Sequence, residues 1–228
     1  MTRDVDPSDP IDQARLTWRD GVPIADQFND PYYSLENGLA ETAHVFLGGN
    51  DLPGRFRDGF HIAELGFGTG LSLLLTLKTW RAQRVPGVLH FSSFEAFPMW
   101  RDDMVASLAA FPTLSPLIEE LSPQFGANSI TTPDLDFQMV QGDARDTLPA
   151  WDGAADAWYL DGFSPAKNPE LWGADLMQAV ANHTAPSGTF ATYTAAGHVR
   201  RGLSQAGFHV ERIPGYGRKR HMTKGSLI

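Results

Sequence analysis

The sequence predicts a single α/β domain with a largely parallel sheet covered by helices, and two observations support this prediction. The first is a glycine-rich turn, residues 64–70, between an extended run at 61–63 and an apolar, proline-free run at 71–80. The second is the alternation of extended and helical segments that continues after this turn, which is typical of parallel sheets. In such folds the glycine turn after the first strand binds a nucleotide. A chain of 228 residues is long enough for one such domain.

Residues 1–50 are expected to form an extension of the same domain, made of a hairpin and a helix. Asp20-Gly21 lies between two short extended runs, and Asp-Gly is a strong hairpin signal. A helix is expected over 39–47, because apolar residues recur on one face and two glycines follow. By analogy with other nucleotide-binding enzymes, such an extension covers the ligand cleft.

The core, residues 51–228, is expected to alternate strands with helices. Six strands are predicted at 61–65, 89–94, 135–140, 155–160, 189–193 and 208–213. The main helices are predicted at 70–83, 99–108, 170–181 and 196–206. The segment 111–134 contains four prolines and is expected to be an irregular connection with one short helix. The basic tail around Met222 is expected to add an antiparallel edge strand, which makes a sheet of seven strands.

Four of the predicted strands end at or beside a carboxylate, namely Glu64, Glu95, Asp143 and Asp161. The carboxyl ends of parallel strands meet at one edge of the sheet, and ligands bind outside that edge. Acids at such positions also cap the following helix, so each one taken alone is either a ligand contact or a helix cap. Their order is more informative. Glu95 is placed to accept hydrogen bonds from ribose hydroxyls, Asp143 to contact an adenine amino group, and Asp161 to lie beside the group that is transferred.

The glycine turn distinguishes between two cofactors. A dinucleotide-binding turn, Gly-x-Gly-x-x-Gly, would need glycine or alanine at position 71, where leucine stands. The turn and the four acids instead resemble motif I and its partners in the Rossmann-like class I methyltransferases that use S-adenosyl-L-methionine. The alternative is a turn that only packs a strand against a helix. The resemblance implies cofactor contacts from Glu64, Gly66, Phe67, Gly68, Thr69, Gly70, Glu95 and Asp143.

The loop after the fourth strand carries the hypothesis about the reaction. A carboxylate at Asp161 can orient an ammonium and help to remove its proton, which makes Asp161 the candidate catalytic residue. Phe163 offers an aromatic face to a base, and Lys167 either reaches a phosphate or is a solvated surface lysine. The Pro-Pro-aromatic sequence of many exocyclic-amine methyltransferases does not follow Asp161, which makes a base-ring amino group a less natural target.

Charge is distributed unevenly along the chain. The net charge is −9, but residues 198–228 hold seven Lys or Arg and one acid, which leaves −15 for residues 1–197. This asymmetry indicates either a localised contact with a polyanion or a solvated tail that balances an acidic body. In the first case, phosphate contacts are expected from Arg218, Lys219 and Arg220.

Longer stretches resemble one family, the tRNA 5-methylaminomethyl-2-thiouridine methyltransferases. They are residues 37–39, 45–50, 64–70, 94–98, 161–169, 171–172, 193–197, 199–203 and 215–220. The resemblance implies methylation of the 5-aminomethyl amine of wobble uridine in tRNA, with S-adenosyl-L-methionine as the donor. A splayed base would stack on aromatic side chains, for which Tyr32, Tyr33 and Phe163 are the candidates.

Many relatives carry a C-terminal FAD-dependent oxidase, and this sequence ends at Ile228 without one. The resemblance therefore implies the stand-alone form, with no FAD and with a separate enzyme that supplies the aminomethyl substrate. Two alternatives remain open. One is a methyltransferase acting on a small amine or on another RNA position, and the other is a non-catalytic module that binds S-adenosyl-L-methionine or RNA.

Composition excludes several classes of site. The sequence contains no cysteine, which excludes disulfides, zinc–thiolate sites and a cysteine nucleophile. No metal is expected. No apolar run approaches the roughly 20 residues of a membrane span, and residues 1–10 hold no secretory signal. A cytoplasmic protein without a membrane contact is therefore the expectation.

Overall fold

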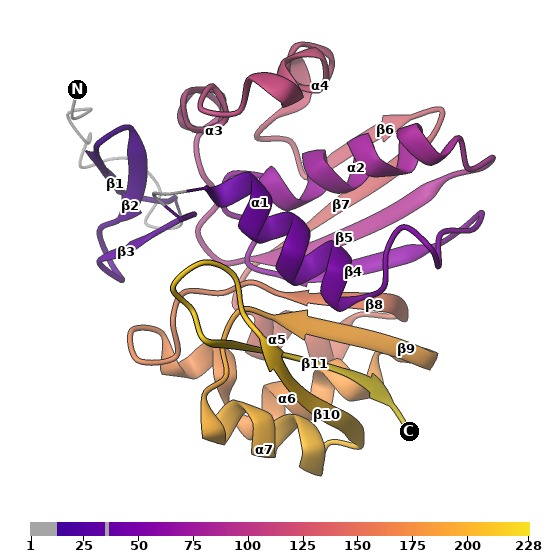
Figure 1. The fold of residues 1–228 in the computed structure, drawn as a ribbon. Coiled ribbons are helices and arrows are strands. Elements are labelled where there is room, and N and C mark those ends of the chain that lie inside the picture. Colours follow the sequence, from indigo (N-terminus) through magenta and orange to yellow (C-terminus); the bar gives the residue numbers. More distant parts are fainter. Residues whose placement is uncertain (1–12, 35–36) are drawn as a thin grey trace.

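The computed structural model describes residues 13–34 and 37–228 and contains two sheets (Figure 1). Residues 1–10, in which the sequence predicts no secretory signal, lie outside the described residues. The small sheet consists of β1 (Leu16–Arg19), β2 (Val22–Ala25) and β3 (Asp30–Pro31). The large sheet consists of β4 (His61–Leu65), β5 (Leu89–Glu95), β6 (Ser129–Thr132), β7 (Leu135–Gln141), β8 (Ala155–Leu160), β9 (Thr184–Thr192), β10 (Phe208–Pro214) and β11 (His221–Leu227).

Helices alternate with these strands as the sequence predicts. The α-helices are α1 (Gly38–Thr42), α2 (Leu71–Gln83), α3 (Arg101–Leu108), α4 (Ser115–Leu121), α5 (Ala144–Thr147), α6 (Ala174–Asn182) and α7 (Gly197–Gln205). Short 3-10 turns lie at Pro112–Leu114, Ser122–Gln124, Leu148–Ala150 and Pro169–Trp172. Helices α1 to α4 lie on one face of the large sheet and α5 to α7 on the other, which confirms the α/β class (Figure 1).

The strand order of the large sheet is β10-β11-β9-β8-β4-β5-β7-β6. The neighbours from β9 to β7 are parallel, whereas β6, β11 and β10 join antiparallel. The predicted count of seven strands was wrong, because β6 forms inside the segment predicted to be irregular. Its pairing with β7 buries Ile130. The strand ends at Thr132, directly before Pro133.

The basic tail does form a strand, but the prediction that it lies at the edge was wrong. Strand β11 lies between β9 and β10. Met222 and Thr223 are completely buried there. Gly225 fits between its neighbours because a Cβ at this position would lie 2.3 Å from the His209 carbonyl oxygen. Buried backbone groups have no access to water, so this part of β11 needs hydrogen-bonding partners on both sides.

Two hydrophobic clusters, one on each face of the sheet, form the core. Successive strand residues alternate between them: Tyr159 belongs to the first cluster, while Trp158 and Leu160 belong to the second. Helix α2 buries Leu74 and Leu77 in the first cluster. This packing holds the carboxyl ends of the parallel strands at one edge, where the site lies.

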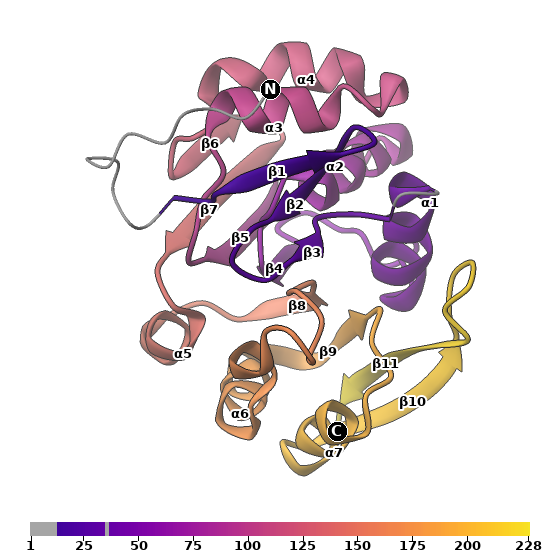
Figure 2. The same ribbon diagram turned by 90° about the vertical axis from the view of Figure 1, so that its left-hand side faces the viewer.

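The N-terminal extension crosses the carboxyl ends of the parallel strands (Figure 2). Asp20 and Gly21 both have positive φ, 50° and 78°, as the predicted tight hairpin turn requires. The predicted helix is present, but it changes from α-helix to a π-helical segment at Ala43–Gly48. The Asn37 side chain caps its start by accepting from the Ala40 N–H at 3.0 Å. No helix in the described part of the chain is long and apolar enough to cross a membrane.

Candidate active site

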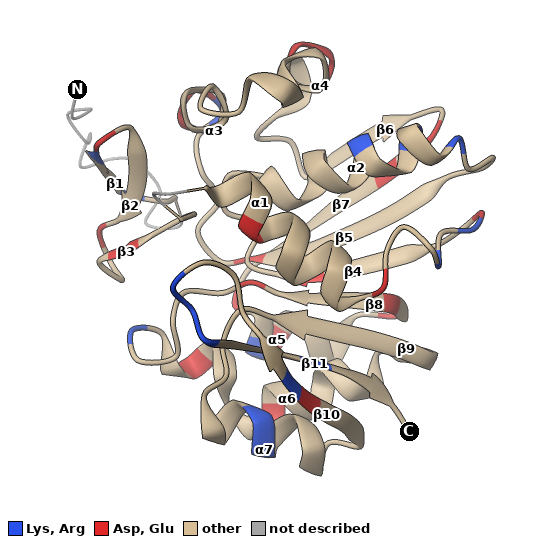
Figure 3. Ribbon diagram, viewed as in Figure 1, with Lys and Arg blue, Asp and Glu red and all other residues tan. Residues whose placement is uncertain are grey.

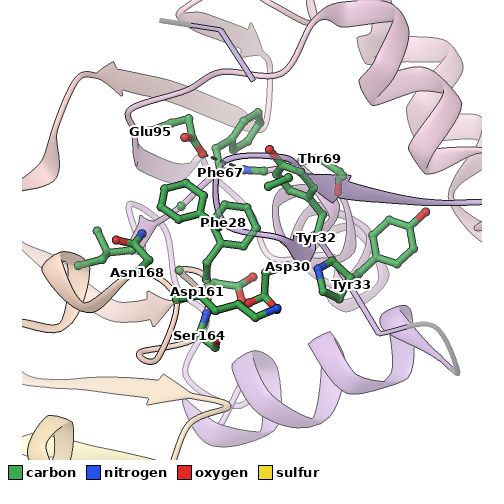
Figure 4. Close-up of a pocket in the computed structure, with 18 of the residues that line it drawn as sticks. Phe28, Asp30, Tyr32, Tyr33, Phe67, Thr69, Glu95, Asp161, Ser164 and Asn168 are labelled. Carbon is green, nitrogen blue, oxygen red and sulfur yellow. Dashed lines mark hydrogen bonds and ion pairs between the residues drawn. The ribbon is translucent and has the colours of Figure 1, made fainter. Parts of the chain in front are cut away.

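A cavity of about 1530 Å³ lies at the carboxyl ends of the parallel strands. Figure 4 shows side chains from the extension, Phe28, Asp30 and Tyr32, reaching into the same space as Glu95 and Asp161 from the strand ends. The glycine turn and the β10–β11 turn complete the wall. Single-ligand pockets usually measure about 300–1,000 Å³, so this cavity has room for a nucleoside cofactor together with part of an acceptor.

The glycine turn adopts backbone conformations that only glycine takes readily. Gly66, Gly68 and Gly70 have φ values of 90°, 54° and 79°. A Cβ on Gly68 would lie 3.1 Å from the ring of Tyr32. Of the residues predicted to contact the cofactor, Gly66, Phe67, Gly68 and Thr69 line the cavity together with Glu95 and Asp143, whereas Glu64 and Gly70 lie behind its wall.

Glu95 is fixed at the end of β5 by the main chain on both sides of it. One carboxylate oxygen accepts from the Gly68 N–H at 3.1 Å and the other from the Phe97 N–H at 2.8 Å. Burial raises the pKa of Glu95, and these hydrogen bonds lower it. Each oxygen keeps a further lone pair, so the carboxylate can still accept from a ligand's hydroxyl groups.

Asp143 lies on the cavity wall and also has the structural role that the sequence left open. Its side chain caps α5 by accepting from the Arg145 N–H at 2.9 Å. The Arg145 guanidinium binds both carboxylate oxygens, at 3.0 and 2.5 Å, and this bond lowers the pKa of Asp143. Asp143 therefore stays ionised while it lines the cavity.

Asp161 and Glu64 form a pair of carboxylates with the Ser72 hydroxyl close to both. Burial raises the pKa of Asp161 to about 7, and the Ser72 hydroxyl lowers it. Glu64 is 1% exposed, and burial and the charge of Asp161 both raise its pKa. The Ser93 hydroxyl donates to one oxygen of Glu64 at 2.8 Å, and the other oxygen has no hydrogen-bond partner. Glu64 thus lies beneath the loop that follows β8, residues 161–169 (the reaction loop), and is kept from ionising by burial and by the charge of Asp161.

The predicted aromatic residues all line the cavity, but only two of them lie together. Phe163 stacks on Phe28 with ring centroids 4.7 Å apart, and Tyr32 packs edge-on against Phe163 at 5.1 Å. Tyr33 packs against Phe111, and its hydroxyl donates to the Ser107 carbonyl at 3.0 Å. The hydroxyl of Tyr33 is therefore engaged within the protein.

Lys167 ties the reaction loop to the extension. Its ammonium contacts the Asp30 carboxylate at 3.0 Å and the Asn29 carbonyl. The second oxygen of Asp30 accepts from the Ser164 N–H at 2.9 Å. The sequence did not single out Asp30, because nothing in its local pattern reveals a partner 137 residues away.

The turn between β10 and β11 is rich in cationic residues (Figure 3), and part of it lines the cavity. We call it the cationic turn. Arg218 and Lys219 line the cavity, whereas Arg220 does not. Lys219 pairs with Glu41 at 2.7 Å and lies over the Tyr193 ring, 4.3 Å from its centroid. Sequence reasoning missed Glu41, Ser72 and Tyr193 as site residues. Tyr193 directly follows β9, so its place at a strand end was a usable signal.

Within residues 13–34 and 37–228, no group of three or more His, Asp or Glu is arranged to hold a metal ion.

The fold and the site define a class I methyltransferase: a parallel sheet, a Gly-x-Gly-x-Gly turn and acids at successive strand ends around one large cavity. Residues 112–228 match the family model described as S-adenosyl-L-methionine-dependent methyltransferase. The chain belongs to this family, and its cofactor is S-adenosyl-L-methionine. The carboxylates of Glu95 and Asp143, which line this cavity, are hydrogen-bond acceptors, the chemistry that the hydroxyl and amino groups of an adenosine require.

Named relatives agree with this assignment. The chain is 45% identical to the tRNA 5-methylaminomethyl-2-thiouridine biosynthesis bifunctional protein MnmC of Caulobacter sp. (strain K31), over 93% of this chain and 38% of that protein. It is 41% identical to the MnmC protein of Chromobacterium violaceum, over 93% of this chain and 34% of the relative. The chain thus spans about a third of the length of these relatives.

A solved structure is also similar. MNMC2 from Aquifex aeolicus superposes with a TM-score of 0.72 at 26% identity, over 90% of this chain and 67% of that one. The family resemblance found in the sequence is thereby confirmed.

Proposed function

We propose that this chain methylates the 5-aminomethyl amine of (2-thio)uridine at the wobble position of tRNA, giving the 5-methylaminomethyl nucleoside. The observation that carries the proposal is the position of Asp161. Its carboxylate shares one cavity with the glycine turn, the Phe163–Tyr32 aromatic pair and the cationic turn. The names of the relatives support the tRNA acceptor.

Asp161 supplies the chemistry that an amine acceptor needs. When bound, S-adenosyl-L-methionine provides a methyl group on a sulfonium that an amine nitrogen attacks in line. An alkylamine carries a proton at neutral pH and becomes a nucleophile only after losing it. Burial raises the pKa of Asp161 to about 7, which makes it a stronger base than an exposed aspartate and leaves it ionised at slightly alkaline pH.

The remaining residues hold the two reactants. Glu64, Gly66, Phe67, Gly68, Thr69, Gly70, Glu95 and Asp143 are proposed to form or support the cofactor half of the site. Tyr32 and Phe163 are proposed to hold the splayed base, since their rings already form one face of the cavity. The structure favours loop support over phosphate contact for Lys167, because Asp30 binds its ammonium.

The acceptor and the partners follow from the same chemistry. Arg218 and Arg220, in the cationic turn, are proposed to contact tRNA phosphates. The aminomethyl group must be made before this step, so a separate activity that unmasks the amine is proposed to precede it. A cytoplasmic location is proposed as well, because it is where a tRNA substrate would be met.

Nucleoside analysis of tRNA tests the proposal. Wobble-modified tRNA that carries the 5-aminomethyl group is incubated with the protein and labelled donor, with spermidine and lysine in parallel as small amines. Label in 5-methylaminomethyl nucleoside is expected with the wild type and not with Asp161→Asn. The exposed Asp102→Asn serves as a control that leaves transfer unchanged. Equal transfer to small amines, or transfer that survives Asp161→Asn, would contradict the proposal.

A further inference from the structure

Lys219 occupies a position in the cavity that is built to hold an ammonium. Its nitrogen lies 2.7 Å from a Glu41 carboxylate oxygen and 4.3 Å from the centre of the Tyr193 ring. A carboxylate and an aromatic face are the two groups that bind alkylammonium ions most effectively. Asp161 lines the same cavity, and the charge of Lys219 lowers its pKa against the larger effect of burial.

The groups that surround this ammonium are mostly buried and come from distant parts of the chain. The Glu41 side chain is only 12% exposed and lies on α1. The hydroxyl of Tyr193 donates to the Gly162 carbonyl at 2.7 Å, which fixes the ring beside the Asp161 loop. The side chain of Lys219 itself is 48% exposed and lies in a turn. The ammonium is therefore the most exposed member of the group, and it can leave for solvent more easily than the acid or the ring can.

A buried carboxylate is costly without a cationic partner. If Lys219 left, Glu41 would need another cation in its place. The acceptor assigned under the proposed function carries such a group, since an aminomethyl amine is an alkylammonium at neutral pH. Exchange of one ammonium for another keeps the charge of the site constant.

We propose that Glu41, Tyr193 and Asp161 form the subsite that binds the ammonium of the incoming acceptor, and that Lys219 fills this subsite until the acceptor displaces it. The inference rests on the proposed function for the identity of the acceptor. It gives Lys219 a role opposite to that of a phosphate contact, because Lys219 then competes with the RNA amine. Glu41 and Tyr193 become specificity residues, since they recognise the amine and not the backbone of the RNA.

Binding of two matched RNAs tests the subsite without turnover. An anticodon stem–loop with 5-aminomethyluridine at the wobble position is compared with the same RNA carrying uridine, by fluorescence anisotropy with S-adenosylhomocysteine present. The wild type is expected to bind the amine RNA more tightly. Glu41→Gln is expected to lower the affinity for the amine RNA by about tenfold and to leave the affinity for the uridine RNA unchanged.

Variants of Lys219 and Tyr193 separate the alternatives. Lys219→Ala is expected to bind the amine RNA more tightly than the wild type does, whereas a phosphate contact would make it bind both RNAs more weakly. Tyr193→Phe keeps the ring and is expected to keep the preference for the amine, which Tyr193→Leu loses. Lys224→Ala, which breaks a tail ion pair with Asp51, is the matched control and should change neither affinity. Thermal melting confirms that each variant is folded.

The outcomes distinguish this inference from the proposed function. Weaker binding of both RNAs by Lys219→Ala, or an unchanged amine preference in Glu41→Gln, would overturn the ammonium subsite. So would equal binding of the two RNAs by the wild type. In each case methyl transfer to the amine RNA, measured separately, shows whether the proposed function still stands.

Discussion

The main chain of Gly66 lies directly against that of Asp161. A Cβ on Gly66 would come within 2.7 Å of the Asp161 carbonyl oxygen, and the Asp161 N–H donates to the Leu65 carbonyl at 3.1 Å. The glycine turn and the reaction loop are therefore held together by backbone contacts at the ends of β4 and β8. The proposed cofactor half and the proposed acceptor half of the site share this contact.

Gly66→Ala is expected to damage the site more than its backbone conformation alone explains. A side chain at φ 90° costs about 1 kcal/mol, and the clash with Asp161 adds to this cost. Gly59→Ala is the matched control, since Gly59 has a φ of 71° and nothing within 4 Å of a Cβ. Calorimetric titration with S-adenosylhomocysteine should show lost affinity in Gly66→Ala alone. Equal effects of the two variants would show that the contact with Asp161 is unimportant.

Local patterns predicted the parts of the fold that depend on neighbouring residues. Strand β4 was predicted with the bounds that it has, and the acids at the strand ends follow from the same runs. The position of β11 was not predictable, because strand order depends on pairing between distant segments. The same holds for the pairs Lys167–Asp30 and Lys219–Glu41, whose members look like ordinary surface charges in the sequence.

Asp161→Asn is expected to abolish methyl transfer and to stabilise the fold at alkaline pH. The pKa of Asp161 rises from 3.8 to about 7 on folding, so the folded state binds its proton more tightly than the unfolded state does. Ionisation of the wild-type residue therefore costs stability as the pH rises from about 4 to about 7, and the full cost remains above that range. Chemical denaturation should show a gain of about 4 kcal/mol for the variant at pH 8 and none below pH 4. A gain independent of pH would contradict this origin.

Ser72→Ala is expected to move the pH dependence of catalysis. The Ser72 hydroxyl lowers the pKa of Asp161 and that of Glu64, so its removal raises both. The base is then ionised only at higher pH, and the midpoint of the pH profile of kcat should shift upward. Thr79→Ala, which removes a hydroxyl bonded to the Leu75 carbonyl on the same helix, is the control. An unchanged midpoint would show that Asp161 is not the titrating base.

Lys167→Met is expected to slow the reaction without changing the salt dependence of tRNA binding. Its ammonium is bound to Asp30, so its loss loosens the reaction loop and removes no phosphate contact. Asp30→Asn should have a similar effect. In a double-mutant cycle the two changes should couple by about 0.5–1 kcal/mol, as is usual for a partly exposed ion pair. Lys78→Met, which loses an exposed contact to the Thr113 carbonyl, provides the control. A smaller salt slope for Lys167→Met would instead indicate a phosphate contact.

Arg218→Ala and Arg220→Ala are expected to weaken tRNA binding uniformly across anticodon sequences, because phosphate contacts carry no sequence information. Both residues are exposed and lie in the cationic turn. Each lost contact should reduce the slope of log K against log salt concentration by about 0.7–0.9, since fewer counterions are released on binding. Filter binding between 50 and 200 mM salt measures this slope, and Lys224→Ala, paired with Asp51, is the control. Unchanged slopes in both arginine variants would show that the tRNA backbone binds elsewhere on the protein. The basic tail would then be a solvated segment whose positive charge balances the acidic residues 1–197.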